Sequence, residues 1–370
     1  MKITSDFPGG NIVIDEIAGD TVRLHQDLRN TDGDWFYWYF RVADAAGRTI
    51  HFEFTRSIAV GARGPAVSLD AGATWNWLGT GPRNRFTYSF PAEGDPVSFC
   101  MTIPYTEADW RRFLRSHTGD PGLRPGTLCT SKKGRPVETL AFGCLHETPR
   151  HRVLIVTRHH ACETMTSFAL EGLVSFVLGG AGPEAARLRE HVGFLAIPFI
   201  DKDGVEDGDQ GKNRRPRDHN RDYDGPSLYP ETAAVRALAA GWTQGRLSAA
   251  LDLHCPWLLG GLNEKVYLVG SPSDDRWREQ QRFSAILERT RTGPLPCRME
   301  DNLPYGQDWN VEGNYQKGRS FANWLSDIPE IPLVTTIELP YANARGVEVN
   351  ADTARAIGVD LARALAVYLD

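Results

Sequence analysis

The pattern of hydrophobic and polar positions changes about a third of the way along the chain. Up to about residue 120, short apolar runs are separated by Gly, Asp and Asn, and residues 86–90 (Phe-Thr-Tyr-Ser-Phe) alternate large and small side chains. Such alternation is typical of half-buried strands, and many short strands favour a β-sandwich. We therefore predict an all-β sandwich domain over residues 1–120, with strands at residues 11–14, 21–24 and 35–42.

Beyond this point, aliphatic runs alternate with segments that have apolar residues at three- and four-residue spacing. The predicted strands are residues 153–156, 194–200, 249–253, 266–269 and 334–337, and the predicted helices are residues 164–178, 230–241, 274–290 and 351–369. Alternating strands and helices are typical of an α/β domain with a mostly parallel mixed sheet. We predict such a domain over residues 121–370, with its ligand site beyond the carboxyl ends of the strands.

Side chains suited to metal binding follow these strands. His160 and Glu163 follow the first strand, His254 the third and Glu338 the last. Two imidazoles and a carboxylate leave Zn²⁺ with an open position, where the pKa of a water falls towards neutrality. A further carboxylate can take the proton of that water. We predict one Zn²⁺ per chain, with Glu338 as the general base and His159 outside the ligand set, since neighbours in an extended chain point opposite ways.

A basic loop lies between the second and third of these strands. It contains the run 212–217 (Lys-Asn-Arg-Arg-Pro-Arg) and ends at Asn220-Arg221. Guanidinium groups bind carboxylates bidentately, so arginines beside a metal site suit a substrate with a carboxylate. The alternative is a solvated basic face for nucleic acid or phosphate. We favour the carboxylate, because Asn220-Arg221 lies among acidic residues close to the predicted site.

The composition narrows the class of protein. The 370 residues carry a formal charge of -6, which argues against a general nucleic-acid binder. We find no apolar run of eighteen residues and no apolar stretch of a signal peptide at the start, so we expect no membrane span and no secretion. The six cysteines lack CxxC spacing, which favours reduced thiols in a cytoplasmic protein.

Together these motifs resemble the zinc metallocarboxypeptidase family, and in particular its cytosolic carboxypeptidase branch. That branch carries HPGET, an NPDGV-like turn, DLNR and a DxH strand end. This chain has HACET at residues 160–164, DKDGV at 201–205, DHNR at 218–221 and DLH at 252–254, and Glu338 matches the base of the family. An aromatic-rich β-domain precedes the catalytic domain in that branch, as we expect here.

The resemblance implies an enzyme that removes C-terminal amino acids from peptides or proteins. Glutamate is one candidate for the residue removed. Asn220 and Arg221 would bind the terminal carboxylate of the substrate. Arg214, with Lys212 as the second candidate, would polarise the scissile carbonyl. Tyr315 would close over the substrate.

Some features leave alternatives open. A zinc amidohydrolase or deacylase of the same fold, acting on a small acylated amino acid, would present the same carboxylate. A non-catalytic binding protein with an aromatic N-terminal domain is the other alternative. Lys317 and Arg319 are the candidate cations for a glutamate side chain, and Tyr305 is the second candidate for the closing tyrosine. Ala161 and Cys162 replace the usual Pro-Gly, which puts a thiol beside the predicted metal.

Overall fold

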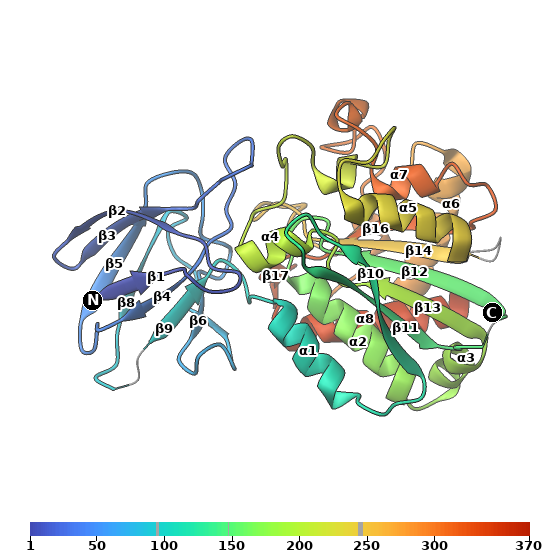
Figure 1. Ribbon diagram of the computed structural model, residues 1–370, viewed down its shortest axis with the longest axis horizontal. Helices are drawn as coiled ribbons and strands as arrows, with labels where there is room; N and C mark the ends of the chain where they lie inside the picture. Colours follow the sequence, from blue (N-terminus) through green and yellow to red (C-terminus); the bar gives the residue numbers. More distant parts are fainter. Residues whose placement is uncertain (94–95, 147, 243–246) are drawn as a thin grey trace.

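The computed structural model describes residues 1–93, 96–146, 148–242 and 247–370. The chain folds into two lobes that lie side by side (Figure 1). We call residues 1–103 the N-terminal lobe and residues 104–370 the C-terminal lobe. Strands make up the smaller N-terminal lobe, whereas helices cover both faces of a sheet in the larger C-terminal lobe (Figure 1).

The described part of the N-terminal lobe contains two sheets. Their orders are β1-β4-β9-β6-β7 and β2-β3-β5-β8. The strands are β1 (Lys2–Thr4), β2 (Val13–Ala18), β3 (Thr21–His25), β4 (Tyr39–Ala43), β5 (Thr49–Phe54), β6 (Ala66–Ser68), β7 (Asn76–Trp77), β8 (Arg85–Ser89) and β9 (Val97–Cys100). The ring of Phe99 on the first sheet lies 5.6 Å from Phe52 and 5.4 Å from Phe86 on the second. The two sheets thus face each other across an aromatic layer, as a β-sandwich requires.

The predicted strand at residues 35–42 is wrong in its first half, because β4 begins only at Tyr39. The backbone N–H groups of Phe36 and Tyr37 do not join a ladder. They donate to Oε1 of Gln210 in the C-terminal lobe, at 3.1 and 2.8 Å. The aromatic run that suggested a strand therefore includes a segment that packs against the other lobe.

The C-terminal lobe is built on a seven-stranded mixed sheet with the order β10-β11-β13-β12-β14-β16-β15. Its strands are β10 (Leu123–Thr130), β11 (Pro136–Gly143), β12 (His151–Thr157), β13 (Val192–Ile197), β14 (Leu247–His254), β15 (Tyr267–Val269) and β16 (Leu333–Glu338). The α/β prediction is confirmed, but only the central pairings of β13, β12, β14 and β16 are parallel. The outer pairings are antiparallel, and the strands β10 and β11 were not predicted.

Helices cover both faces of this sheet. They are α1 (Glu107–Ser116), α2 (Met165–Gly179), α3 (Pro183–His191), α4 (Lys202–Asp207), α5 (Pro230–Trp242), α6 (Asp274–Thr290), α7 (Phe321–Leu325) and α8 (Ala351–Tyr368). Alternate residues of β12 belong to two cores: Val153 and Ile155 pack with α2 and α8, and Leu154 and Val156 pack with α5 and α7. Figure 1 shows these helix pairs on opposite sides of the strands. The four predicted helices agree with the structure to within one residue at each end.

The helices α2 and α8 cross at two glycines. A Cβ on Gly172 would lie 1.9 Å from the carbonyl oxygen of Arg355, and one on Gly358 would lie 1.8 Å from that of Ala169. Only glycine permits this approach of two backbones, and it fixes the position of α2. Among the described residues no single helix is long and apolar enough to cross a membrane, although α2 and α3, bent by 91°, pass that test as a pair.

The helix α1 packs against the rest of the C-terminal lobe. The ring of Trp110 is 6.4 Å from that of Phe199, and the preceding Tyr105 packs edge-on against Phe168 of α2 at 4.9 Å. The division of the chain at residue 120 remains a prediction. These contacts favour a division before α1.

Candidate active site

The carboxyl ends of the central strands border a cavity of about 280 Å³. Its lining includes His160, His254 and Glu338 from the strand ends and Lys212, Asn220 and Arg221 from the basic loop. The register of the sheet explains the first set, because His254 of β14 lies directly opposite Glu338 of β16. Thr157, at the end of β12, lies opposite Leu253 on the other side of β14. The four strand-end residues expected from the sequence therefore reach one site, with Glu163 buried beneath it.

A sharp elbow after β12 aims His160 and Glu163. Arg158 has a φ of +58°, in the left-handed region that non-glycine residues rarely adopt, so the chain turns before the two histidines. The buried guanidinium of Arg158 holds the turn: it donates to the carbonyls of Ala161 and Tyr105 and to Oγ of Ser167. The elbow is thereby tied both to α2 and to the segment that joins the lobes.

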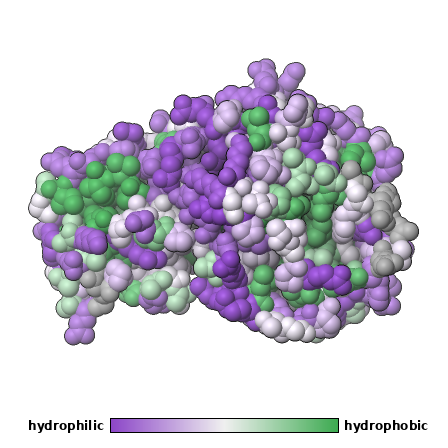
Figure 2. Space-filling view, viewed as in Figure 1, coloured by the Kyte–Doolittle hydropathy of each residue, from purple (hydrophilic) through white to green (hydrophobic). Residues whose placement is uncertain are grey.

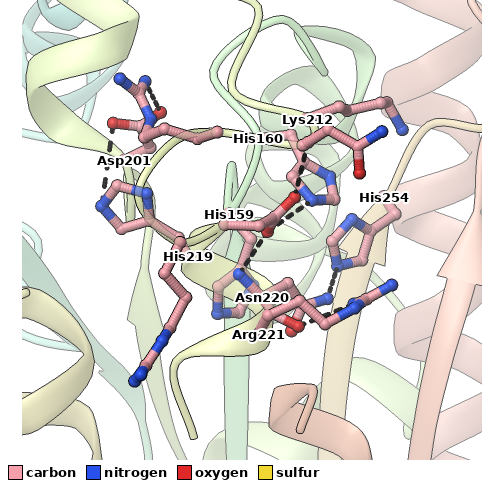
Figure 3. Close-up of polar contacts among 12 residues, drawn as sticks. His159, His160, Asp201, Lys212, His219, Asn220, Arg221 and His254 are labelled. Atoms are coloured by element: carbon pink, nitrogen blue, oxygen red, sulfur yellow. Dashed lines mark hydrogen bonds and ion pairs between the residues drawn. The ribbon is translucent and has the colours of Figure 1, made fainter. Parts of the chain in front are cut away.

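His160, Glu163 and His254 converge on one point. Nδ1 of His160 lies 2.9 Å from Oε1 of Glu163, and Nδ1 of His254 lies 2.9 Å from Oε2 of the same carboxylate. The ligand atoms of the three side chains all lie within 4.8 Å of one another. Figure 3 shows the rings of His160 and His254 side by side, with Asn220 and Arg221 close to them.

A carboxylate holds the far nitrogen of each histidine. Nε2 of His160 lies 3.1 Å from Asp218, and Nε2 of His254 lies 3.0 Å from Asp252. Burial opposes the charged forms, but these carboxylates together with Glu163 raise the pKa of both histidines. Conversely, the histidines hold the pKa of both aspartates below the usual range despite burial. Such carboxylate–histidine pairs orient imidazoles for a metal.

This arrangement fits a metal ion. The group supplies two imidazole nitrogens and a carboxylate, which is the donor set of open zinc sites. Glu163 is fully buried, and its Oε2 has no hydrogen-bond donor with good geometry among the described residues. Burial opposes its ionisation, but the charges of His160, His254 and Lys212 hold its pKa well below the usual range. Glu163 is therefore an ionised carboxylate that is already in place for a metal ion.

A second group of possible ligands lies beneath the first. It consists of His159, Asp252 and His254. His159 is fully buried and lies outside the cavity lining, with Nδ1 2.8 Å from Asp252 and Nε2 2.8 Å from the hydroxyl of Tyr223. Burial lowers the pKa of His159, so its ring is neutral. His159 therefore supports Asp252, and the candidate metal site is the group of His160, Glu163 and His254, whose two histidines line the cavity.

Glu338 is a carboxylate without an anchor. Among the described residues its buried Oε2 has no hydrogen-bond partner. Burial raises the pKa of Glu338 to about 6, although the positive charges of His254 and Lys212 oppose this shift. A base is most effective when its pKa lies near the working pH. The environment of Glu338 is that of a proton acceptor, not of a structural ion pair.

Lys212 and Arg214 have different surroundings although only one residue separates them. Nζ of Lys212 donates to Glu163 at 2.6 Å and to the carbonyl of Cys255 at 2.7 Å. Arg214 lies outside the lining of the cavity and forms ion pairs with Asp201 and, at 2.8 Å, Asp209. The structure thus brings Lys212, the second candidate, beside the group of His160, Glu163 and His254, which we call the metal group. Arg214, the preferred candidate, does not reach it.

The glycine before Lys212 explains this placement. Gly211 has a φ of +84°, and a Cβ there would lie 2.3 Å from the backbone nitrogen of Ala161. The loop therefore packs flat against the elbow, which brings Lys212 over Glu163. Burial lowers the pKa of Lys212, but the charge of Glu163 outweighs it and raises that pKa above the usual range, so the amine stays charged.

Asn220 and Arg221 both line the cavity but are held differently. The amide of Asn220 is engaged: Nδ2 lies 2.9 Å from Nε2 of His254 and 3.2 Å from Asp252, and Oδ1 accepts from the backbone of Phe321. Arg221 donates to the carbonyls of Asn220 and Asn314, and no carboxylate of the described residues pairs with it. Arg221 is therefore the cation that remains available for a substrate anion.

Tyr315 also lines the cavity, whereas Tyr305 does not. The ring of Tyr315 lies 5.2 Å from the guanidinium carbon of Arg221, and its hydroxyl donates to Oδ1 of Asn310 at 2.8 Å. Burial raises the pKa of Tyr315 to about 12, so the hydroxyl keeps its proton. Tyr315 lies where it can cover a group bound to Arg221.

The wall below Glu338 is uncharged. Thr336 precedes Glu338 by two residues on β16, so both side chains face the cavity, about 7 Å apart along the strand. Val269 of β15 lies opposite Thr336, and Trp309 lines the same cavity. The two cations considered for a glutamate side chain lie elsewhere: Lys317 lines a neighbouring cavity, and Arg319 pairs with Asp327.

Several residues of this site had no predicted role. Asp218 and Asp252 hold the two histidines, and only the second had a local signal, since residues i and i+2 of a strand share a face. Trp35 of the N-terminal lobe and Trp257 also line the cavity. Nothing in the local pattern around Trp35 indicated a place in the site.

We compared the chain with known proteins, first by sequence. No family model matches the chain. The chain is 31% identical over 147 residues to cytosolic carboxypeptidase 2 of Xenopus tropicalis, covering 37% of this chain and 15% of that protein. It is 26% identical over 219 residues to the human cytosolic carboxypeptidase 2, covering 55% of this chain and 23% of that protein. The chain thus spans less than a quarter of the length of these two relatives.

Solved structures match over the whole chain. A metallo-carboxypeptidase from Burkholderia cenocepacia has a TM-score of 0.80 at 22% identity and covers 100% of this chain and 98% of its own. The metallo-carboxypeptidase from Pseudomonas aeruginosa, in complex with (2-guanidinoethylmercapto)succinic acid, has a TM-score of 0.77 at 21% identity with full coverage of both chains. The chain therefore shares the metallo-carboxypeptidase fold and is similar in sequence to cytosolic carboxypeptidases, which confirms the resemblance expected from its motifs.

Proposed function

We propose that this protein is a zinc-dependent carboxypeptidase that hydrolyses C-terminal amino acids from peptides or proteins. One observation carries the proposal: a single cavity combines a His–Glu–His group with a carboxylate and a guanidinium that form no ion pair within the described part of the chain. The names of the relatives in sequence and of the solved structures support the same reaction. Free thiols at all six cysteines and the cytosolic relatives support a cytoplasmic location.

His160, Glu163 and His254 would hold one Zn²⁺ per chain. Bound there, the ion would supply a Lewis acid for the substrate carbonyl and lower the pKa of a water. Asp218 and Asp252 keep the two imidazoles oriented. Asn220 supports His254 through its amide, so we assign it to positioning more than to binding the substrate.

Glu338 takes the proton of the attacking water and then delivers it to the leaving amine. Its pKa of about 6 keeps it ionised at neutral pH and still able to accept a proton. Lys212 faces the carbonyl as it gains negative charge, because its amine lies beside the metal group and stays protonated. We therefore assign to Lys212 the role expected of Arg214.

Arg221 binds the terminal carboxylate, and Tyr315 covers it. A chain end is selected because an internal peptide segment has no carboxylate for this guanidinium. The C-terminal side chain then meets Val269, Trp309 and Thr336. This wall suits an uncharged side chain, and the placement of Lys317 and Arg319 gives no support to a preference for glutamate.

The decisive experiment is a panel assay on the purified protein. Peptides that differ only in the C-terminal residue, and N-acyl amino acids with the same residues, are incubated with and without a chelator. We expect chelator-sensitive release of uncharged C-terminal residues from the peptides. Cleavage of N-acyl amino acids alone would establish the deacylase instead. If the protein cleaves neither kind of substrate and contains no stoichiometric zinc, it is a non-catalytic binding protein.

A further inference from the structure

The N-terminal lobe supplies one side chain to the cavity. Among the residues that the structure describes, Trp35 is the only one of that lobe in the lining, where it joins Pro256 and Trp257 of the C-terminal lobe. Trp35 and Trp257 are both partly exposed. Two indoles at the mouth of a polar site are not required by the metal, the base or the carboxylate-binding group. Their position relative to the metal group and Arg221 indicates which part of a bound peptide they contact.

The cavity reaches from one face of the sheet to the other. Arg221 donates to the carbonyl of Asn314, and Asn220 accepts from Phe321, so this end belongs with α7 and its core. Trp35 and Trp257 pack with the other core, that of α2 and α8. The metal group lies between these ends. A peptide whose carboxylate binds Arg221 and whose last bond lies at the metal group therefore directs its preceding residues towards Trp35.

The indole of Trp35 is held in place before any ligand arrives. Its Nε1 donates to the carbonyl of Asp32 at 2.9 Å, and its ring packs edge-on against Phe36 at 5.8 Å. Phe36 in turn packs edge-on against Trp257 at 6.0 Å. The ring of Trp35 lies 6.0 Å from Nζ of Lys212. A partly exposed aromatic surface that is already ordered binds at a low entropic cost.

Backbone pairing joins this segment to the loop that carries Lys212. Asp32 donates to the carbonyl of Asn213 at 3.1 Å, and Arg215 donates to that of Asn30 at 2.8 Å. Arg29 pairs with Asp209 at 2.8 Å. Figure 2 shows hydrophilic residues gathered along the seam between the lobes on the face it presents.

Gln210 extends this connection to the elbow. Its Oε1 accepts from the backbone of Phe36 and Tyr37, and its Nε2 lies 3.1 Å from Sγ of Cys162. One buried side chain thus contacts both the segment after Trp35 and the elbow that bears His160 and Glu163. Gln210 therefore links the segment that follows the indole to the elbow that bears the two candidate ligands.

We propose that Trp35 and Trp257 form a binding subsite for an apolar or aromatic residue on the N-terminal side of the scissile bond. The N-terminal lobe is then part of the substrate-binding site, and it sets a preference at the penultimate position. This inference rests on the proposed carboxypeptidase function. Aromatic and aliphatic side chains pack on an indole, whereas glycine offers no surface to it.

Two peptides and four variants test the proposal. The peptides are acetyl-Gly-Phe-Xaa and acetyl-Gly-Gly-Xaa, where Xaa is the C-terminal residue that the unmodified protein releases fastest. The variants are Trp35→Ala, Trp35→Phe, Trp257→Ala and the control Trp75→Ala. Trp75 belongs to the same lobe and donates to the carbonyl of Gly72, but it lies outside the cavity lining.

We expect the unmodified protein to prefer the Phe peptide, with Trp35→Ala lowering kcat/KM for it by roughly tenfold, mainly through KM. For the Gly peptide the loss should be about twofold or less, so the preference nearly disappears. Trp257→Ala should act in the same direction, Trp35→Phe should keep most of the preference, and Trp75→Ala should change neither. If Trp35→Ala does not fold, Trp257→Ala and Trp35→Phe decide.

An equal loss on both peptides in Trp35→Ala and Trp257→Ala would show a purely structural role and overturn the subsite. The absence of a preference in the unmodified protein would overturn it too, while leaving the carboxypeptidase function intact. If the unmodified protein cleaves neither peptide, the proposed function fails and the subsite with it.

Discussion

The strand ends and the basic loop both supply side chains to the cavity, but they position them by different means. His254 and Glu338 lie where the register of β14 and β16 puts them, and the surrounding sheet holds that register. Lys212 depends on the left-handed Gly211 and on pairing between the loop and the N-terminal lobe. The cavity thus combines side chains that the sheet positions with side chains that the contact of the two lobes positions. Substitutions in the two regions should therefore fail in different ways.

The strand-end carboxylate should show the largest effect on the reaction. We expect Glu338→Gln to lower kcat by roughly 10³- to 10⁴-fold, because an amide cannot accept the proton. Metal content and the urea midpoint should stay close to those of the unmodified protein, since the buried Oε2 of Glu338 has no hydrogen-bond partner among the described residues. Steady-state kinetics, with metal analysis of the same sample, check this. Full turnover by the variant would remove Glu338 from the role of base.

A matched pair in the loop sharpens the comparison. We expect Lys212→Met to lower kcat by roughly 10²- to 10³-fold, because the charge that faces the carbonyl is lost. We expect Arg214→Met to keep kcat/KM in its folded fraction but to lower the free energy of unfolding by about 3–5 kcal/mol, because Asp201 and Asp209 stay buried without their cation.

Kinetics and urea titration of both variants provide the measurement. A loss of kcat confined to Arg214→Met would reverse the assignment of the two cations. It would also restore Arg214 as the carbonyl-polarising residue that the sequence favoured.

The carboxylate-binding end allows a second pair. We expect Arg221→Gln to raise KM roughly 10- to 100-fold with a smaller change in kcat, because a charge-assisted contact to the substrate carboxylate is lost. Arg217→Gln is the control, because Arg217 lies outside the active-site cavity and pairs with Asp222 at 2.9 Å. Peptides with an amidated C-terminus should be poor substrates for the unmodified protein. Equal KM values for the free and amidated peptides would contradict the role of Arg221.

The pH dependence should show the smallest effect. Burial raises the pKa of Glu338 to about 6, and the base must be ionised to act. We therefore expect kcat/KM to be constant above this pH and to fall about tenfold per pH unit below it. The raised pKa of Lys212 keeps the amine charged, so this residue should cause no loss in mildly alkaline solution. A pH–rate profile with a metal-saturated sample checks the acidic and the alkaline side. An apparent pKa near 4 on the acidic side would contradict the raised pKa of Glu338.

The sequence predicted one of the two regions much better than the other. Aliphatic runs locate strand ends, and strands of one parallel sheet end at one edge, so His160, His254 and Glu338 could be expected to meet. The loop has no period from which a direction can be read. Whether Lys212 or Arg214 faces the site depends on one glycine conformation and on pairing with residues 30–32, which are far away in sequence.

The fold shows the same division. The helices α6 and α8 could be located from their apolar spacing. The edge strand β10 (Leu123–Thr130) could not, because it contains Pro and Gly and leaves most of its side chains partly or fully exposed. Residues 35–38 look like a strand because they are aromatic, yet the backbone N–H groups of Phe36 and Tyr37 donate to Gln210 of the other lobe. Patterns within a segment therefore predict what the segment buries, but not which distant segment it meets.

The crossing of α2 and α8 at Gly172 and Gly358 also sets an order of events during synthesis. Nearly two hundred residues separate the two glycines in the sequence, and ribosomes add about 5–20 residues per second, so α2 emerges roughly 10–40 s before the helix that covers it. When α2 emerges, the strands that end at His254 and Glu338 are still to come. The three proposed metal ligands therefore cannot assemble until most of the chain has been made, whereas the residues of the N-terminal lobe are made first.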